Sequence, residues 1–164
     1  MLISQAHAEK YVRHYRTLSK PLGPHRWQSR VEKLALEVEA RHVLDYGCGR
    51  RRLEKFSKLP IVNYDPGIPE YAADPGPADL VVCLHVLEHV EPSCVDSVLE
   101  HLVSLSIKQL LIVVSCENGS EVFKDGENLH CFVRSSDWWR NRLNGFRELP
   151  ALLPKGREFA ACWP

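Results

Sequence analysis

The sequence predicts an α/β fold with a largely parallel, Rossmann-like sheet covered by helices on both faces. Short apolar segments with the length of buried strands lie at 42–46, 61–64, 80–84 and 110–114. Between them are stretches whose apolar residues recur at helical spacing. Strands that alternate with amphipathic helices are typical of a three-layer sandwich.

The expected helices follow from apolar spacing and from caps. The first covers about residues 8–18 and ends at the breaker Pro21–Pro24. Later helices are expected at 31–38, at 51–58 and from Pro92 through Leu102. Ser135 or Ser136 caps a last helix, whose Trp138 and Trp139 we expect to pack on the sheet edge.

Two further segments set the limits of the sheet. Residues 66–78 carry four Pro and two Gly, which predicts a shaped loop and leaves little room for another strand. Residues 146–149 and 158–163 are expected to form a closing antiparallel hairpin.

Composition places the chain among globular domains. Its 164 residues, 45% hydrophobic and 26% charged, predict one domain over 1–164. No apolar run is long enough to cross a bilayer, and the start lacks a signal-peptide core, so a cytoplasmic location is expected.

The net charge of zero hides a block pattern. Residues 1–58 hold 13 Lys/Arg and 6 Asp/Glu, whereas residues 59–107 hold 8 acids and neither Lys nor Arg. We expect these two blocks to lie on opposite sides of one binding cleft.

Cysteine and histidine spacing gives no support to a metal centre. None of the six Cys forms a Cys-x-x-Cys pair, and none of the eight His has the HExxH spacing. We therefore expect structural thiols and no metal site.

The strongest functional signal is the segment Val43–Gly49, VLDYGCG. Two glycines one residue apart let a ligand approach the backbone at the start of a helix. Asp45 ahead of them can receive an ammonium group or a backbone amide. Asp65, after the second strand, has the place of a carboxylate that binds both ribose hydroxyls. Together these residues predict a site for an adenosine-containing cofactor.

The order VLDYGCG, YDP and ADLVVCLHVLEHVEP resembles class I S-adenosylmethionine-dependent methyltransferases over about residues 40–105. The longer string, followed by DGENLH and DWW, is similar to small methyltransferases of phages and bacteria. The resemblance implies S-adenosyl-L-methionine as cofactor. It also implies a seven-stranded Rossmann-like sheet with an antiparallel last strand, which we expect to be trimmed because residues 66–78 leave little room for the usual third strand. The cofactor-binding residues that we predict are Asp45, Tyr46, Gly47, Cys48, Gly49, Asp65, Pro66, Cys83, Leu84 and His85.

The chain departs from the family at Arg51, where a third glycine is usual. A long side chain there could crowd the helix start, point to solvent, or pair with an anionic substrate or with the cofactor carboxylate. The same stretch lacks the GxGxxG of a nicotinamide-dinucleotide site, because Arg52 stands at the last glycine.

Methyl transfer needs a base only if the acceptor must lose a proton. The candidate catalytic residues are His130 and His85, with Glu88 as an orienting acid. His89, beside Glu88, is expected to hold its loop together.

The N-terminal segment 1–28 interleaves aromatic and basic residues. We interpret it as a lid over the cofactor rather than as a nucleic-acid surface. The leading hypothesis is a methyltransferase that acts on a small molecule or a nucleotide. The alternatives are a non-catalytic S-adenosylmethionine-binding regulatory protein and a nucleic-acid methyltransferase. No membrane partner is expected.

Overall fold

The computed structural model describes residues 1–17 and 23–164. Its six-stranded sheet has the order β2-β1-β3-β4-β6-β5. The first four are parallel, and β6 runs antiparallel to both β4 and β5. The strands are β1 (Val43–Tyr46), β2 (Ile61–Tyr64), β3 (Ala78–Leu84), β4 (Ser106–Ser115), β5 (Arg147–Glu148) and β6 (Glu158–Trp163).

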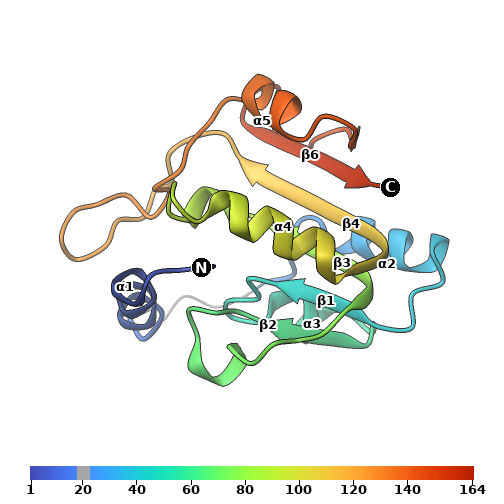
Figure 1. Cartoon of the computed structure of the whole chain (residues 1–164), viewed down its shortest axis with the longest axis horizontal. Helices are drawn as coiled ribbons and strands as arrows, with labels where there is room; N and C mark the ends of the chain where they lie inside the picture. Colours follow the sequence, from blue (N-terminus) through green and yellow to red (C-terminus); the bar gives the residue numbers. More distant parts are fainter. Residues whose placement is uncertain (18–22) are drawn as a thin grey trace.

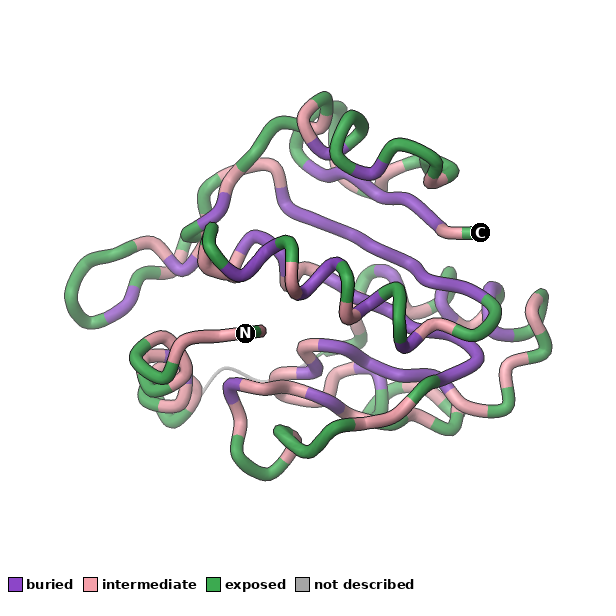
Figure 2. The backbone as a smooth tube through the Cα atoms, in the orientation of Figure 1, coloured by how far each residue is buried: buried purple, intermediate pink, exposed green. Residues whose placement is uncertain are grey.

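Helices cover both faces of the sheet (Figure 1). One face packs against α4 (Val95–Leu105) and α5 (Ser136–Arg142), and the other packs against α2 (Gln28–Glu37) and α3 (Arg52–Phe56). Alternate residues of each central strand enter opposite layers, as Val81 and Val82 do in β3. The strand β3 is buried along its whole length, and β4 is buried from Gln109 to Ser115 (Figure 2).

The predicted fold class is confirmed, with a trimmed sheet. Between β2 and β3 the chain forms only the short 3-10 helix η1 (Pro69–Tyr71) instead of a strand. The C-terminal hairpin closes the other side of the sheet, with Arg147 paired to Cys162. Ser135 accepts a hydrogen bond from the Trp138 N–H, which confirms the predicted cap of α5, and Trp139 is buried in the core.

The N-terminal helix α1 (Gln5–Tyr15) lies at the edge where the parallel strands end (Figure 1). It begins earlier than the apolar spacing predicts, because Ser4 accepts a hydrogen bond from the His7 N–H and caps it. The predicted breaker residue Pro21 and the predicted helix end Leu18 lie outside the described residues.

All six thiols are free, as the sequence predicts. Within residues 1–17 and 23–164, no helix has the length and apolar character needed to span a bilayer.

Candidate functional site at the carboxyl ends of the strands

The glycine turn after β1 is held by β2 and crowded by the loop after β3. The N–H groups of Gly47 and Cys48 donate to the Tyr64 carbonyl at 2.7 and 3.1 Å. Gly47 has a φ of 76°, and a Cβ atom there would lie 2.5 Å from a methyl carbon of Val86. Only glycine fits both the backbone conformation and the space.

Asp65 closes this turn from the neighbouring strand. Its carboxylate accepts one hydrogen bond from the Gly49 N–H at 3.0 Å and another from the Gly67 N–H at 2.9 Å. Burial raises the pKa of Asp65, and the two N–H donors oppose that shift. The carboxylate therefore joins the glycine turn to the loop after β2, at the place where the sequence predicts a ribose-binding acid.

Arg51 takes up the backbone conformation for which glycine is the usual residue. Its φ of 57° lies in the left-handed region, directly before α3. The side chain pairs with Glu54 at 3.1 Å and lies over the Tyr71 ring. Of the three arrangements that the sequence leaves open, the structure has Arg51 at the surface, away from the glycine turn.

Asp45 lies on β1, which leads into the glycine turn, and Cys83 lies on the neighbouring strand β3. Asp45 is buried at the end of β1, and burial, with the charges of Asp65 and Glu54, raises its pKa to about 7. Cys83 is fully buried in the core, so the structure gives it no surface for a ligand, contrary to its predicted place in the cofactor site.

His85 lies between two buried carboxylates. Its Nδ1 is 3.3 Å from Glu88 Oε1, and its Nε2 is 3.1 Å from Glu158 Oε2, although off the line of a hydrogen bond. Burial would lower the pKa of His85, but the contacts with Glu158 and Glu88 outweigh burial and raise it to about 9. At neutral pH the imidazole is therefore a cation between the carboxylates of Glu88 and Glu158.

Glu158 is a site residue that sequence reasoning missed. It stands at the start of β6, where its carboxylate accepts from the Trp27 indole N–H at 3.1 Å and from the Leu152 N–H at 2.7 Å. Burial would raise its pKa, but His85 and Trp27 lower it to about 2. One signal in the sequence was a single acid at the start of an apolar strand, because a buried acid needs a partner.

Trp27 is fully buried beneath this carboxylate. A stacking surface for nucleic acid needs exposed rings, so Trp27 does not contribute to one. Tyr11 is also buried, where its hydroxyl donates to the Leu129 carbonyl at 3.2 Å.

The helix α1 lies across the mouth of the site. Ser4 donates from its N–H and its hydroxyl to the two oxygens of Glu91, both at 2.8 Å. Lys10 pairs with Asp125 at 2.8 Å, in the loop after β4. At the end of the helix, the Tyr15 hydroxyl stands so close to Gly49 that a Cβ atom there would be 2.9 Å away. The predicted lid segment thus contacts three of the loops that follow strands.

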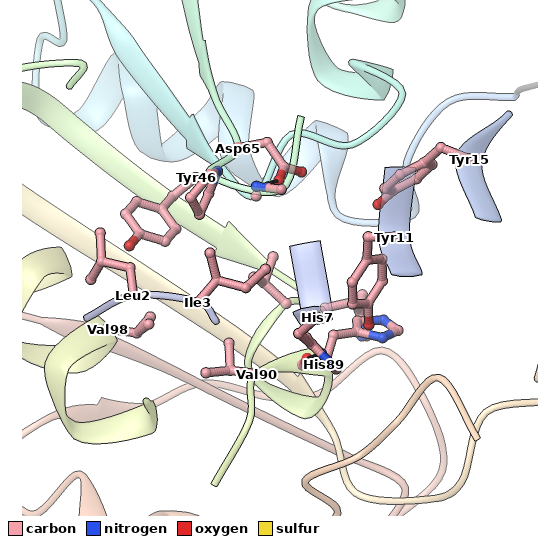
Figure 3. A pocket seen from close by; sticks show the side chains of 15 residues that line it. Leu2, Ile3, His7, Tyr11, Tyr15, Tyr46, Asp65, His89, Val90 and Val98 are labelled. Carbon is pink, nitrogen blue, oxygen red and sulfur yellow. Dashed lines mark hydrogen bonds between the residues drawn. The ribbon is translucent and has the colours of Figure 1, made fainter. Parts of the chain in front are cut away.

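Three adjoining cavities open beneath α1, and Tyr15 and His85 line all of them. The first, of about 110 Å³, is bordered by Ile3, Tyr46 and Asp65 (Figure 3). The second, of about 270 Å³, lies against Asp45 and the glycine turn. We call the third the large cleft. It measures about 830 Å³ and lies between α1 and the loop after β4.

The predicted site residues meet at these cavities. Tyr46, Gly47, Asp65, Pro66 and His85 line the first cavity, and Asp45, Gly47, Cys48, Gly49, Leu84 and His85 line the second. Cys83 lines none of the three. His130 and His85, the two candidate bases, both line the large cleft, together with His25, which sequence reasoning did not single out.

The two charge blocks both reach the large cleft. Arg26 and Arg52 come from the basic block, and Glu88 comes from the acidic block. The last third of the chain adds Glu121 and Arg157. Opposite charges therefore do face one cleft, but the division is less simple than the sequence blocks predict.

No protein-family model and no curated protein sequence matches the chain. Solved structures do match it. The 1,6-didemethyltoxoflavin N1-methyltransferase of Burkholderia thailandensis, with bound S-adenosylhomocysteine, is 17% identical at a TM-score of 0.63, over 94% of this chain and 85% of its own. The chain has the methyltransferase fold.

Two further structures agree. The N-methyltransferase NodS of Bradyrhizobium japonicum, in complex with S-adenosyl-L-homocysteine, is 13% identical at a TM-score of 0.57, over 95% of this chain and 96% of its own. The magnesium protoporphyrin IX methyltransferase of Synechocystis, also with bound S-adenosylhomocysteine, is 15% identical at a TM-score of 0.54, over 96% of this chain and 94% of its own. At such identities the likeness concerns the fold.

Proposed function

We propose that the chain is an S-adenosyl-L-methionine-dependent methyltransferase that acts on a small-molecule or nucleotide acceptor. The observation that carries this proposal is the joining of the glycine turn to Asp65, beside two small cavities that share Tyr15 and His85 with the large cleft. Methyltransferases with bound S-adenosylhomocysteine share this fold.

The cofactor is expected to occupy the two smaller cavities. Asp65 has the place and the burial to accept both ribose hydroxyls, and Pro66 and Ile3 supply apolar surface beside it. Asp45 and the backbone at Leu84 and His85 border the second cavity, where a carboxylate suits the ammonium of the methionine part.

The acceptor is expected to enter the large cleft. A sulfonium methyl group is already activated, so alignment of the acceptor and exclusion of water supply much of the catalysis. Of the two candidate bases, His130 is better placed than His85. Both ring nitrogens of His85 face carboxylates. In the His130 ring, only Nδ1 has a hydrogen-bond partner in the described part of the chain, the Glu117 carbonyl at 2.6 Å.

Calorimetry with S-adenosylmethionine and S-adenosylhomocysteine tests cofactor binding. We expect Asp65→Asn to weaken binding about tenfold or more, since it removes charged hydrogen bonds to ribose. Glu70→Gln, an exposed acid in the following loop, should leave binding unchanged. If the wild type releases no heat with either ligand, the proposal fails.

Transfer of a radiolabelled methyl group into cell extract tests catalysis. Label in small-molecule fractions supports the proposed acceptor class. Label only in nuclease-sensitive material would point to the nucleic-acid alternative. Cofactor binding without transfer to any fraction would point to a regulatory protein.

A further inference from the structure

Three side chains that could share a metal ion meet on the floor of the large cleft. Glu88 and His89 belong to the short 3-10 helix η2 (Leu87–His89) after β3, and His130 belongs to the loop after β4. One ligand atom of each residue lies within 4.8 Å of the other two. The two rings meet edge to face, with 4.7 Å between their centroids.

Both imidazoles are held through Nδ1 by a backbone carbonyl. Nδ1 of His89 lies 3.0 Å from the Leu129 carbonyl, and Nδ1 of His130 lies 2.6 Å from the Glu117 carbonyl. A carbonyl only accepts, so each Nδ1 must carry the proton and each Nε2 keeps its lone pair. A second hydrogen bond of this kind is what orients metal-binding histidines in proteins.

Glu88 offers a carboxylate oxygen that makes no hydrogen bond within the described part of the chain. Its side chain is fully buried, and Oε1 contacts His85 and accepts from the Ser115 N–H at 3.1 Å. Oε2 is buried and has no hydrogen-bond partner among the described residues. Burying a polar oxygen without a partner is unfavourable, and a bound cation would remove that cost.

The loop after β4 is built to place His130. The Asn128 side chain bonds both backbone groups of Gly119, at 3.1 and 2.8 Å, and accepts from the His130 N–H at 2.9 Å. A Cβ atom at Gly119 would lie 2.9 Å from the His130 ring, so glycine makes room for the imidazole. These contacts hold the ring over η2 from a distant part of the chain.

We propose that Glu88 Oε2 with Nε2 of His89 and His130 forms a binding site for a divalent transition-metal ion in the large cleft. Two imidazoles and one carboxylate suit Mn²⁺, Fe²⁺, Co²⁺ or Zn²⁺ better than Mg²⁺ or Ca²⁺. Metal–ligand bonds of about 2.0 to 2.2 Å require the three side chains to close by roughly an ångström around the ion.

The ion's remaining positions would face the cleft, where they can take an oxygen of the acceptor. This last point rests on the proposed function, whereas the metal site itself does not. Ligation and proton acceptance by His130 exclude each other because both use the Nε2 lone pair. The sequence spacing alone led us to expect no metal site, since His130 lies far from Glu88 and His89 along the chain.

Titration of the chelator-treated full-length protein with Co²⁺ or Mn²⁺ alone tests the site. Calorimetry should give one ion per chain, and Co²⁺ should develop visible absorption bands from nitrogen and oxygen ligands. His130→Ala should weaken binding at least about tenfold, and Asn128→Ala, which releases the ring, should weaken it less. His14→Ala is the matched control, because His14 lines the same cleft outside the cluster. It should bind as the wild type does.

Absence of saturable binding by the wild type up to millimolar metal would overturn the proposal. Equal affinity in the wild type and in His130→Ala would also overturn it. S-adenosylhomocysteine binding, measured in the same metal-free samples, separates the two proposals. Cofactor binding without metal binding defeats only the metal site, and metal binding without cofactor binding defeats only the proposed function.

Discussion

At the scale of single residues, the site is a set of acidic groups whose pKa values are raised by burial and lowered by neighbouring cations. Asp45, Asp65, Glu88 and Glu158 are all buried or nearly so at one edge of the sheet. Glu88 and Glu158 gain His85 as a partner and have lowered pKa values, whereas Asp45 has no cationic partner among the described residues and its pKa rises. Asp45 is therefore the acid whose ionisation costs most in the absence of a cationic ligand.

The Asp45→Asn substitution should stabilise the ligand-free protein more at pH 8 than at pH 5. The pKa of Asp45 is raised to about 7 in the fold, so its contribution to stability falls as pH rises through that value. Between pH 5 and 8 the gain from Asn should grow by on the order of 2 kcal/mol. Urea denaturation at both pH values measures it. An equal gain at the two would contradict the raised pKa.

The Gly47→Ala variant should be destabilised more than Gly126→Ala. Both glycines have positive φ, but only Gly47 would bring its Cβ atom into contact with Val86, whereas a Cβ atom at Gly126 would have no described atom within 4 Å. The conformational cost is about 1 kcal/mol at each, and the overlap adds about 1 to 3 kcal/mol at Gly47. Equal losses in denaturation would mean that Val86 moves aside freely.

At the scale of elements, short helices and loops do the positioning while the strands supply a rigid base. The helix α3 has only five residues and starts from Arg51 in a left-handed conformation. The loop after β4 carries His130, and α1 reaches it through the pairing of Lys10 with Asp125. Elements with few buried contacts of their own are the ones whose order a ligand can change.

The Arg51→Gly variant should be more stable than the wild type by about 0.5 to 1 kcal/mol. Glycine relieves the left-handed backbone, and the exposed pair with Glu54 contributes less than that relief. Arg50→Gly is the matched control, because Arg50 is not in this conformation and should gain nothing. Cofactor affinity should stay unchanged in Arg51→Gly. A large loss of affinity would mean that its side chain does touch the ligand.

Binding of S-adenosylhomocysteine should slow amide hydrogen exchange in α1. This helix contacts the glycine turn through Tyr15. It is held by polar contacts such as Ser4 with Glu91 and by the packing of Tyr11 against Phe123. The helix α5 packs against β6, away from α1 (Figure 1), and is the internal control. Equal changes in both helices would contradict a lid role for residues 1–28.

At the scale of the whole molecule, the parallel strands converge on one edge, and every predicted site loop leaves from that edge. The glycine turn follows β1, Asp65 follows β2, η2 follows β3, and His130 lies on the loop after β4. The antiparallel strand β6 brings Glu158 to the same edge because it starts where β4 ends. Ligands of open α/β sheets bind at this edge for the same reason.

Saturation with S-adenosylhomocysteine should raise the Tm of the whole domain. A ligand that binds only the folded state at about 100 times its Kd adds about 2.7 kcal/mol, or roughly 5 to 11 °C for a domain of this size. Asp65→Asn should lose most of this shift. A thermal-shift assay at several ligand concentrations measures the effect, and a Tm that does not depend on concentration would count against cofactor binding.

The amino-acid sequence by itself determined the element types, the glycine turn, Asp65 and the trimmed sheet, because these depend on local spacing and on backbone conformation. It also led correctly to free thiols and to a buried Trp139. Only the tertiary structure decided where Arg51 points, that Glu158 meets His85, and that His130 stands over Glu88 and His89. These contacts join distant parts of the chain, so their geometry depends on how strands and loops pack and not on any local pattern.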